Sequence, residues 1–513
     1  MSEGSFYITT AIDYVNGSPH LGHAYEKITT DVIARWRRLR GDQVRFLTGT
    51  DEHGIKVERT ARDAGLTPKD YVDQLAPSFQ RAWDQLDISY DRFIRTTDPD
   101  HARSVVLLLE RIRDNGYLRE GSYEGWYCEG CEAFKTEKDF VDGRCPEHPN
   151  RAPRWLEESN LFFELSRFTQ PLLEHIAANP SFIEPEFRRN EVLGLLREGL
   201  EDISISRSDE SVSWGIPIPF REGTVIYVWF DALINYLTGA GFGSDAALFE
   251  ELWPADLHII GKDIGRFHCI IWPAMLLAAG LPLPHQVFLH GWVLTSGEKM
   301  SKSTGVSIDP EEMASTWGAD PLRYFLTSEV SFGRDGEFSW KRFEEVYNAH
   351  LANGLGNLLS RATGMALKYF DSVPDPKGRR DSLLSEVCEK ATGEAAQCYD
   401  RLELHRATAA AWRIISSCNE QIQHREPWKM AKNPDQRGDL AEFLYAVLES
   451  LRIAMILLSP VIPNKAGECL KAMGCEQAQS FAADCRWGGL KAGAPLQKPA
   501  PLFPRIEAKA PAS

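Results

Sequence analysis

Apolar and polar residues alternate near the start of the chain in the way expected of a parallel α/β fold. Residues 6–12 form an apolar run that predicts a buried strand, and residues 22–40 carry apolar side chains at helical spacing with arginines mostly on the opposite face. A second apolar run at 43–47 predicts another strand. Strand, helix and strand within so short a span indicate a right-handed crossover between parallel strands.

The pattern changes further along the chain and divides it into several parts. Helical periods continue to residue 115, whereas residues 116–223 begin with a stretch rich in glycine, cysteine, glutamate and aromatic residues. Apolar strands and helices return over 224–339, residues 340–490 are helical in pattern almost throughout, and a proline-rich tail follows at 491–513. We therefore predict an α/β fold in which a Rossmann-like parallel-sheet domain, 1–115 and 224–339, is split by an inserted module and followed by an α-helical bundle.

Composition limits the location and the partners of the protein. The 513 residues are 43% apolar, but no apolar run is long enough to cross a bilayer and the first residues lack the features of a secretory signal. We therefore expect a cytoplasmic protein with no membrane contact. The formal net charge of −16 argues against a protein that coats nucleic acid through bulk electrostatics, so a nucleic-acid partner would need local contacts.

Two histidines flank the predicted start of the first helix, in the sequence Pro19-His20-Leu21-Gly22-His23. Backbone N–H groups at a helix start bind phosphate, and imidazoles there add donors for the charge that develops during phosphoryl or nucleotidyl transfer. Gly22 would let a flat base approach the backbone. The alternative interpretation is a pair of ordinary surface or capping histidines. The turn lacks the G-x-G-x-x-G of dinucleotide-binding folds.

A second candidate motif is the loop GEKMSKS at 297–303, which follows a strand predicted at 286–294. Lys299 and Lys302, with neighbouring serines, make a mobile cationic loop that could close on a triphosphate and stabilise the departing pyrophosphate. The alternative is a solvated lysine and serine loop. A small nucleotidyltransferase also uses H-x-G-H, but it would need neither a helical half nor a metal module.

Four potential metal ligands occur in two closely spaced pairs in the inserted module. The spacing Cys128-x2-Cys131-x13-Cys145-x2-His148 predicts a tetrahedral zinc site. A redox C-x-x-C pair is the alternative, but the cysteines do not follow a strand at a helix start. Because four protein ligands leave no open position, we expect one zinc ion with a structural role.

The order of these motifs resembles the methionyl-tRNA synthetases, a class I aminoacyl-tRNA synthetase family, over nearly the whole chain. H-x-G-H after the first strand and K-M-S-K-S after a late strand are the paired signature of that class. The resemblance implies ATP-dependent activation of L-methionine to methionyl-adenylate, with Mg²⁺ on the ATP, and transfer of methionine to the 3′-terminal adenosine of initiator and elongator tRNA(Met). The matching segments are FYITTAIDYVNGSPHLGHAYE, FLTGTDEHG, the cysteine cluster, ISISR, VSWGIPIP, YVWFDALINY, HIIGKDI, HGWVLTSGEKMSKS and DPLRYFL.

The resemblance also implies a role for particular residues. Charge on the ATP phosphates would be stabilised by His20, His23, Lys299 and Lys302, and the nucleotide would also contact Gly22, Gly261 and Asp263. The methionine pocket would comprise Ile12, Asp51, Trp229, Tyr236 and His268, with Asp51 paired to the substrate ammonium. The CAU anticodon would be read by Asn357, Arg361 and Trp428 in the helical domain at 340–490. From residue type alone, the aromatic residues in these lists would be assigned to the core.

Some features depart from the family pattern and leave alternatives open. Ala11 and Asp13 replace a proline and a bulky residue, and Leu21 replaces the commoner isoleucine, so the pocket wall or the helix start could differ. No C-terminal oligonucleotide-binding barrel is apparent, which favours a monomer. The alternatives are a synthetase for another apolar amino acid and a catalytically inactive tRNA-binding relative. The insertion at 116–223 is too short for the large editing domain of the leucine, isoleucine and valine enzymes.

Overall fold

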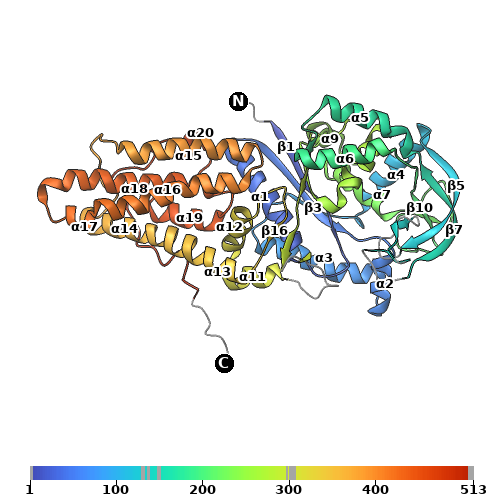
Figure 1. Cartoon of the computed structure of the whole chain (residues 1–513), viewed down its shortest axis with the longest axis horizontal. Helices are drawn as coiled ribbons and strands as arrows, with labels where there is room; N and C mark the ends of the chain where they lie inside the picture. The colour runs from blue at the N-terminus through green and yellow to red at the C-terminus, as the bar shows by residue number, and fades with distance from the viewer. Residues whose placement is uncertain are drawn as a thin grey trace.

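The computed structural model is elongated, with a sheet-containing half and a helical half (Figure 1). The chain builds the sheet-containing half first, and helices from the last third of the chain form the other half. The residues that the structure describes are 4–128, 133–135, 139–141, 143–146, 152–295, 298–299 and 308–506.

A parallel sheet forms the centre of the first half. Strand β1 (Ser5–Thr10) lies between β3 (Gln43–Asp51) and β12 (Leu257–Gly261), and both pairings are parallel. The predicted parallel α/β sheet is therefore confirmed, with strands from before and after the inserted segment side by side. The order among the described residues is β2 (Asp13–Tyr14), β3, β1, β12, β13 (Val287–His290) and β8 (Ile183–Glu184), with β4 (Arg92–Arg95) also paired to β3.

The first helix, α1 (Leu21–Arg40), connects β1 to β3 and packs on one face of the sheet. His20 is the N-cap residue of this helix, and its ring accepts a hydrogen bond from the backbone N–H of Gly22. It ends at Gly41, whose φ of 99° is a left-handed conformation that suits glycine. Ile28, Val32 and their neighbours at helical spacing are buried, so the predicted apolar stripe is confirmed.

Helices cover both faces of the parallel sheet. One face carries α1, α3 (Pro68–Gln85), α11 (Pro310–Trp317) and α12 (Ala319–Glu329), and its core continues into the helical half. The other face carries α4 (Pro99–Asp114), α8 (Asn235–Gly239) and α10 (Trp272–Ala278). Shorter helices in the same half are α2 (Ile55–Asp63), α7 (Val228–Leu233) and α9 (Ala246–Leu252).

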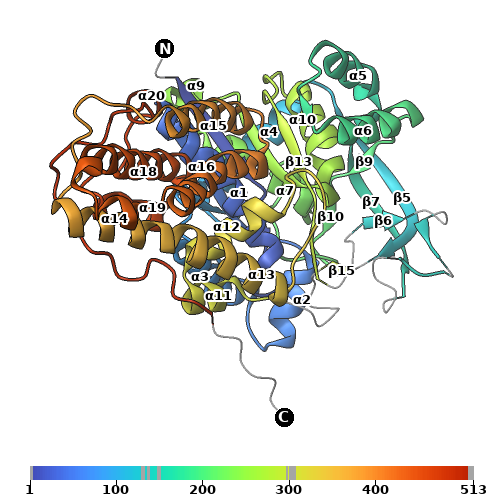
Figure 2. The same ribbon diagram turned by 60° about the vertical axis from the view of Figure 1, so that its left-hand side comes forward.

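The segment between the two parts of the parallel sheet has an antiparallel sheet of its own. Strand β5 (Leu118–Cys128) pairs with β7 (Arg154–Phe163), and this sheet projects away from the helical half (Figure 2). Its edge strands are β6 (Ala133–Lys135) and β9 (Ile203–Ser204). The same segment also returns to the parallel sheet, since β8 pairs with β13, and α5 (Thr169–Ala178) and α6 (Glu186–Glu198) contribute to the core beneath it.

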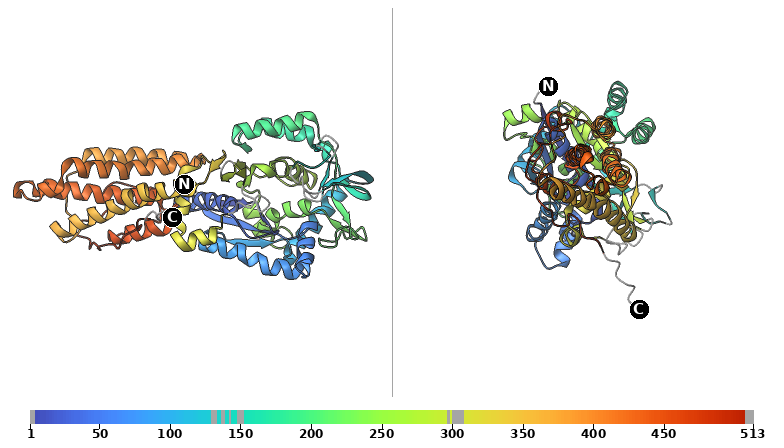
Figure 3. Two further views of the ribbon diagram at one scale, coloured as in Figure 1. Left: turned by 60° about the horizontal axis from the view of Figure 1, so that its bottom comes forward. Right: turned by 90° about the vertical axis from the view of Figure 1, so that its left-hand side faces the viewer.

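Long helices lie side by side along the axis of the helical half (Figure 3). They are α15 (Ser382–Asp400), α16 (Leu404–Arg425) and α18 (Arg437–Leu458), and they confirm the predicted helical bundle. Trp36 of α1 stacks on Tyr399 with ring centroids 4.8 Å apart, so the sheet and the bundle share one apolar core. The other helices here are α13 (Trp340–Val346), the π-helical η6 (Tyr347–Gly356), α14 (Asn357–Phe370), α17 (Pro427–Met430), α19 (Pro463–Ala472) and α20 (Phe481–Asp484).

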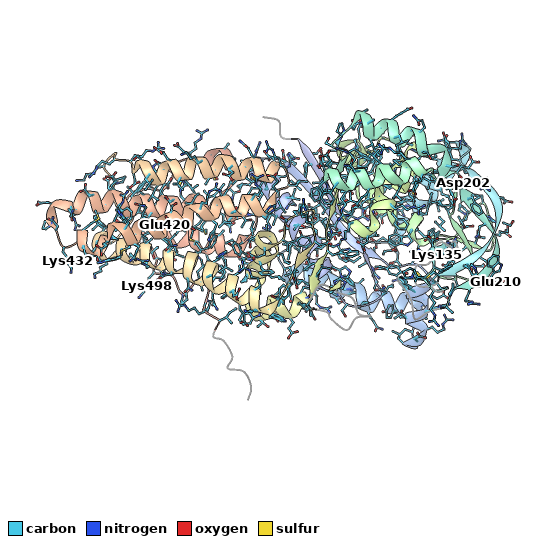
Figure 4. The ribbon with its side chains drawn as sticks, in the orientation of Figure 1. Lys135, Asp202, Glu210, Glu420, Lys432 and Lys498 are labelled. Atoms are coloured by element: carbon cyan, nitrogen blue, oxygen red, sulfur yellow. The ribbon has the colours of Figure 1, made fainter. Side chains whose placement is uncertain are left out.

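Charged side chains of both signs occur at both ends of the molecule (Figure 4). Glu420, Lys432 and Lys498 lie on the helical half, whereas Lys135 and Asp202 lie at the opposite end. The negative net charge therefore does not leave either end without basic groups. None of the helices in the described part of the chain combines the length and the apolar composition needed to cross a membrane.

Candidate active site

A cavity of about 260 Å³ opens at the carboxyl ends of β1, β3, β12 and β13. The chain continues from β1 towards β3 on one side and from β12 towards β13 on the other, so the strand order reverses between β1 and β12. Ligands of open α/β folds bind at the carboxyl ends of the strands at such a reversal, which is where the cavity lies. Every residue nominated for ATP or methionine whose side chain the structure describes lines this cavity. They are Ile12, His20, Gly22, His23, Asp51, Trp229, Tyr236, Gly261, Asp263 and His268.

The two histidines of the H-x-G-H motif both cap α1 and line the cavity. The Nδ1 of His20 accepts from the Gly22 N–H at 3.1 Å, and the Nδ1 of His23 accepts from the His20 N–H at 3.2 Å. The two rings stack with centroids 3.8 Å apart. A neutral imidazole that accepts at Nδ1 carries its hydrogen on Nε2, so each ring has a donor at the atom far from the helix backbone. The capping and the ligand-facing interpretations are therefore compatible.

Gly22 has a reason to be glycine that the sequence does not reveal. A Cβ at this position would lie 2.9 Å from Cε1 and 3.0 Å from Nδ1 of the His20 ring. Such contacts would push the ring out of its capping position. We predicted that Gly22 lets a base approach the backbone, and the structure adds that it makes room for His20.

The lysine loop starts and ends beside the H-x-G-H motif. Strand β14 (Val293–Thr295) pairs with β15 (Glu298–Lys299), and Val293 lines the cavity. On the other side of the loop, the Ile308 carbonyl accepts from the Leu21 N–H at 3.0 Å. The Lys299 backbone belongs to β15, but its side chain and the whole of Lys302 lie outside the described residues.

One end of the cavity is formed by a buried hydrogen-bonded pair of rings. The Tyr236 hydroxyl donates to Nε2 of His268 at 2.7 Å, and Nδ1–H of His268 donates to the Ile264 carbonyl at 3.0 Å. His268 lies in the π-helical turn η4 (Phe267–Ile271). Burial lowers the pKa of His268 to about 4 and raises the pKa of Tyr236, so both rings are neutral near pH 7. Trp229 completes this end by stacking on Phe267, with centroids 4.2 Å apart.

Another part of the cavity wall is formed by residues that follow β12 and β13. A Cβ on Gly261 would lie 2.6 Å from Oδ1 of Asp263, so a side chain at this position would displace the Asp263 carboxylate. The same Asp263 oxygen accepts from the Trp292 indole N–H at 3.2 Å. Trp292 and His290 line the cavity but were not nominated from the sequence, although HGW follows an apolar strand just as IIGKD does. That shared position at a strand end is the signal that could have found them.

Buried charges behind the cavity explain what the unusual Asp13 does. Lys27 is fully buried, and its ammonium donates to the Ala11 carbonyl (2.9 Å), to Asp13 (2.9 Å) and to Glu26 (2.8 Å), which uses all three of its hydrogens. The other Glu26 oxygen lies 3.0 Å from Nε2 of His290. Burial alone would raise the pKa of Glu26, but Lys27 and His290 lower it. The departure at Asp13 therefore ties the pocket wall to α1.

Two of the four predicted zinc ligands lie in the described part of the chain. Cys128 and Cys145 are both buried, whereas Cys131 and His148 lie outside the described residues. Residues 129–132 join the paired ends of β5 and β6, because Cys128 pairs with Ala133. Within the described ranges no group of three or more potential ligands surrounds a metal position.

The three anticodon candidates gather at the far end of the helical half from the sheet. Asn357 and Arg361 lie one turn apart on α14, and the Arg361 guanidinium lies 5.9 Å from the ring centroid of Trp428 on α17. The labels of α14 and α17 mark this end in Figure 1. The cavity and these residues are thus two separate sites on one elongated molecule.

Comparison with known proteins gives a consistent family over the whole chain. Residues 6–154 and 149–363 match the model of tRNA synthetases class I (M), and residues 374–512 match the anticodon binding domain of methionyl tRNA ligase. Methionine–tRNA ligase of Caldanaerobacter subterraneus is 44% identical over 98% of this chain and 79% of its own, and that of Thermosynechococcus vestitus is 44% identical over 98% and 97%. The structure of Mycobacterium tuberculosis methionyl-tRNA synthetase in complex with methionyl-adenylate is 43% identical, with a TM-score of 0.93 over 98% of this chain and 100% of that one. The chain therefore belongs to the methionyl-tRNA synthetase family of class I aminoacyl-tRNA synthetases.

Proposed function

We propose that the chain catalyses the ATP-dependent methionylation of tRNA(Met), with the cavity as the site of methionyl-adenylate formation. The observation that carries this proposal is the meeting of the H-x-G-H histidines, the strand that leads into the lysine loop and the Tyr236–His268 pair around one cavity. The adenylate in the related Mycobacterium tuberculosis structure supports it. Transfer of the methionyl group to the terminal ribose of tRNA would follow at the same site.

In the proposed activation step the methionine carboxylate attacks the α-phosphorus of ATP, and the bond to the β-phosphate breaks as pyrophosphate leaves. Asp51 would hold the substrate ammonium, which fixes the carboxylate near its target. The Nε2–H groups of His20 and His23 would donate to phosphate oxygens as charge grows on them. Lys299 and Lys302 would stabilise the leaving pyrophosphate, and Mg²⁺ bound with ATP would neutralise part of the triphosphate charge.

The neutral, aromatic end of the cavity favours methionine over polar amino acids. Sulfur is a weak acceptor and packs well against aromatic edges. Since the Tyr236 proton is already donated to His268, neither ring needs a hydrogen bond from the substrate. We therefore assign the thioether to Tyr236, His268 and Trp229, Ile12 to the wall beside it, and the nucleotide to Gly22, Gly261 and Asp263.

A panel of amino acids in ATP–pyrophosphate exchange tests this function. Methionine should drive exchange with a kcat/KM at least about 100-fold above leucine, isoleucine, valine or cysteine, because the cavity combines an ammonium partner with a neutral aromatic end. An enzyme that prefers leucine or cysteine would overturn the pocket assignment. A protein that binds tRNA(Met) but catalyses no exchange would instead be an inactive relative.

We further propose that the antiparallel sheet in the inserted segment carries one structural zinc ion. Cys128 and Cys145, both buried in that segment, would bind it together with Cys131 and His148. The short connection between β5 and β6 supports this, because it carries Cys131 three residues after Cys128. Zinc would supply folding energy to this module.

Zinc content provides a direct test of this module. Elemental analysis of the purified protein should give about one zinc per chain, and Cys145→Ser should reduce it to near zero because a closed site needs all four ligands. Cys388→Ser is a matched control, since Cys388 is equally buried but lies on α15 in the helical half. Equal zinc content in both variants would contradict the ligand set.

At the far end of the bundle we assign anticodon recognition to Asn357, Arg361 and Trp428. An aromatic ring beside a guanidinium offers one surface for stacking an unpaired base and one group for hydrogen bonding to it. A few such contacts reconcile tRNA binding with a net charge of −16. The cavity and this end lie in different halves of the elongated molecule (Figure 1), so a substrate that touches both must extend along it.

A further inference from the structure

A buried aspartate behind the cavity wall is contacted by two histidines from different parts of the chain. Asp231 lies on α7 and is fully buried, and its two oxygens face two different rings. Nδ1 of His53, from the loop after β3, is 2.6 Å from Oδ2, and Nε2 of His101, from α4, is 2.7 Å from Oδ1. None of these three residues lines the cavity. The proposed mechanism gives them no role.

The hydrogen bonds of this cluster fix which atoms carry hydrogen. Burial by itself would raise the pKa of Asp231, but the two imidazoles outweigh it and lower the pKa to about 2, so the carboxylate is ionised and accepts from both rings. Nδ1 of His101 meets the Thr238 hydroxyl at 3.2 Å, which extends the cluster from α7 to α8. Asp231 therefore joins three separate segments through charge-assisted hydrogen bonds.

The segments that Asp231 joins carry two different parts of the proposed methionine site. His53 follows Asp51 by two residues, and Asp231 follows Trp229 by two residues. Asp51 and Trp229 both line the cavity, as does Tyr236 on α8. The Asp231–His53 hydrogen bond thus joins the segment that carries Asp51 to the helix that carries Trp229.

The rest of the Asp51 loop is held from the other side. Glu52 is fully buried and accepts from the Arg95 guanidinium at 2.6 and 2.9 Å, while its carbonyl accepts from the Trp214 indole N–H at 2.6 Å. With Glu52 and His53 both engaged inside the protein, Asp51 is the member of this triplet that faces the cavity. Of these two anchors, only the one through His53 reaches the helix that carries Trp229.

We propose that Asp231, acting through His53, is a positioning residue that sets the separation between the ammonium subsite at Asp51 and the side-chain subsite at Trp229 and Tyr236. This inference rests on the proposed methionine-activating function and adds to it a determinant of amino-acid affinity outside the cavity. Among the described residues, no hydrogen bond joins this cluster to the nucleotide wall at β12 and β13. We therefore expect changes in the cluster to alter the affinity for methionine and not the affinity for ATP.

Steady-state pyrophosphate exchange by Asp231→Asn, with methionine and ATP varied separately, tests the proposal. The amide keeps the shape but removes the charge and one acceptor, so we expect KM for methionine to rise about tenfold while KM for ATP stays within about twofold. The double variant Asp51→Asn with Asp231→Asn should be no worse than Asp51→Asn alone, because both changes act on one subsite. Unchanged KM for methionine, or fully additive losses, would overturn the proposal.

A control variant on α4 shows whether Asp231 positions the methionine site or only stabilises the fold. Ser104→Ala removes another buried hydrogen bond, from Ser104 to the Phe242 carbonyl at 2.7 Å, and should lower the melting temperature without raising KM for methionine. If Asp231→Asn matches this control in both respects, Asp231 is only structural and the proposal fails.

Substitutions at His53 keep the proposal testable even if Asp231→Asn does not fold. His53→Gln retains an N–H donor and should keep KM for methionine within about threefold, whereas His53→Leu should raise it about tenfold. Equal values for the two variants would overturn the proposal. The wild-type rate separates failure of the proposed function from failure of this inference. If the wild type shows no methionine-dependent exchange, the proposed function itself is rejected. If the wild type is active but the variants leave KM for methionine unchanged, only the positioning role of Asp231 is rejected.

Discussion

Replacing His23 by alanine should slow methionine-dependent pyrophosphate exchange by about 10²- to 10³-fold, which is the usual cost of removing one donor to a developing negative charge. The ring lines the cavity, and its Nδ1 accepts from the His20 backbone, which leaves the hydrogen on Nε2. The loss should appear mainly in kcat, because the hydrogen bond strengthens as charge moves onto the phosphates. Pyrophosphate exchange with saturating methionine and ATP measures it.

Because His23 also caps the helix, two further substitutions can separate its capping role from its proposed catalytic role. In His23→Asn the side-chain oxygen can take the place of Nδ1 and keep the cap, whereas in His23→Gln the amide nitrogen reaches the region of Nε2. We therefore expect Asn to preserve the melting temperature but not the rate, and Gln to retain more of the rate. If the rates instead follow the melting temperatures across the three variants, His23 is only a capping residue and its proposed catalytic role is wrong.

The sequence predicted the parts of this fold that depend on local periodicity. The apolar stripe that contains Ile28 and Val32 predicts a helix, and the apolar run of β1 predicts a strand. Because these elements follow one another closely, a crossover between parallel strands is the simplest topology. His20, Gly22 and His23 were nominated from the chemistry of their motif, whereas the methionine-pocket residues were found by family resemblance, since a buried Tyr236 looks like any core tyrosine. Its hydrogen bond to His268 depends on a contact 32 positions away in the chain.

The features that were missed all depend on long-range pairing. Lys27 sits in a helical pattern where a lysine is normally expected to face solvent, yet it is buried because Asp13 and Glu26 neutralise it. Strand β8 lies within the inserted segment but joins the main sheet beside β13, which no local pattern indicates. The contact between His290 and Glu26 could not be predicted, because nothing in the HGW sequence reveals that Glu26, 264 positions earlier, will face it.

A buried arginine joins the catalytic sheet to the helical half, and its removal should have the largest effect on stability. Arg323 on α12 is fully buried and donates to Asp31 of α1 at 2.6 Å. It also donates to the carbonyls of Val461 and Pro460, which precede α19, at 2.9 Å each. Arg323→Met should cost about 3–5 kcal/mol, because it leaves a buried carboxylate and several carbonyls without their partner. Urea unfolding monitored by tryptophan fluorescence at pH 7.5 measures the loss.

The pH dependence gives this prediction a second, independent readout. Burial would raise the pKa of Asp31, but Arg323 and Arg35 lower it, so the ionised carboxylate stabilises the fold above its unfolded pKa and this contribution is lost as pH falls towards the folded value. Without Arg323 the folded pKa rises, so Arg323→Met should unfold at a higher pH than the wild type. Arg35→Met is the matched control: it removes the other cation on Asp31, but Arg35 is 23% exposed and should cost less. Equal losses in the two variants would mean that Arg323 stabilises the protein through packing and not through its buried ion pair.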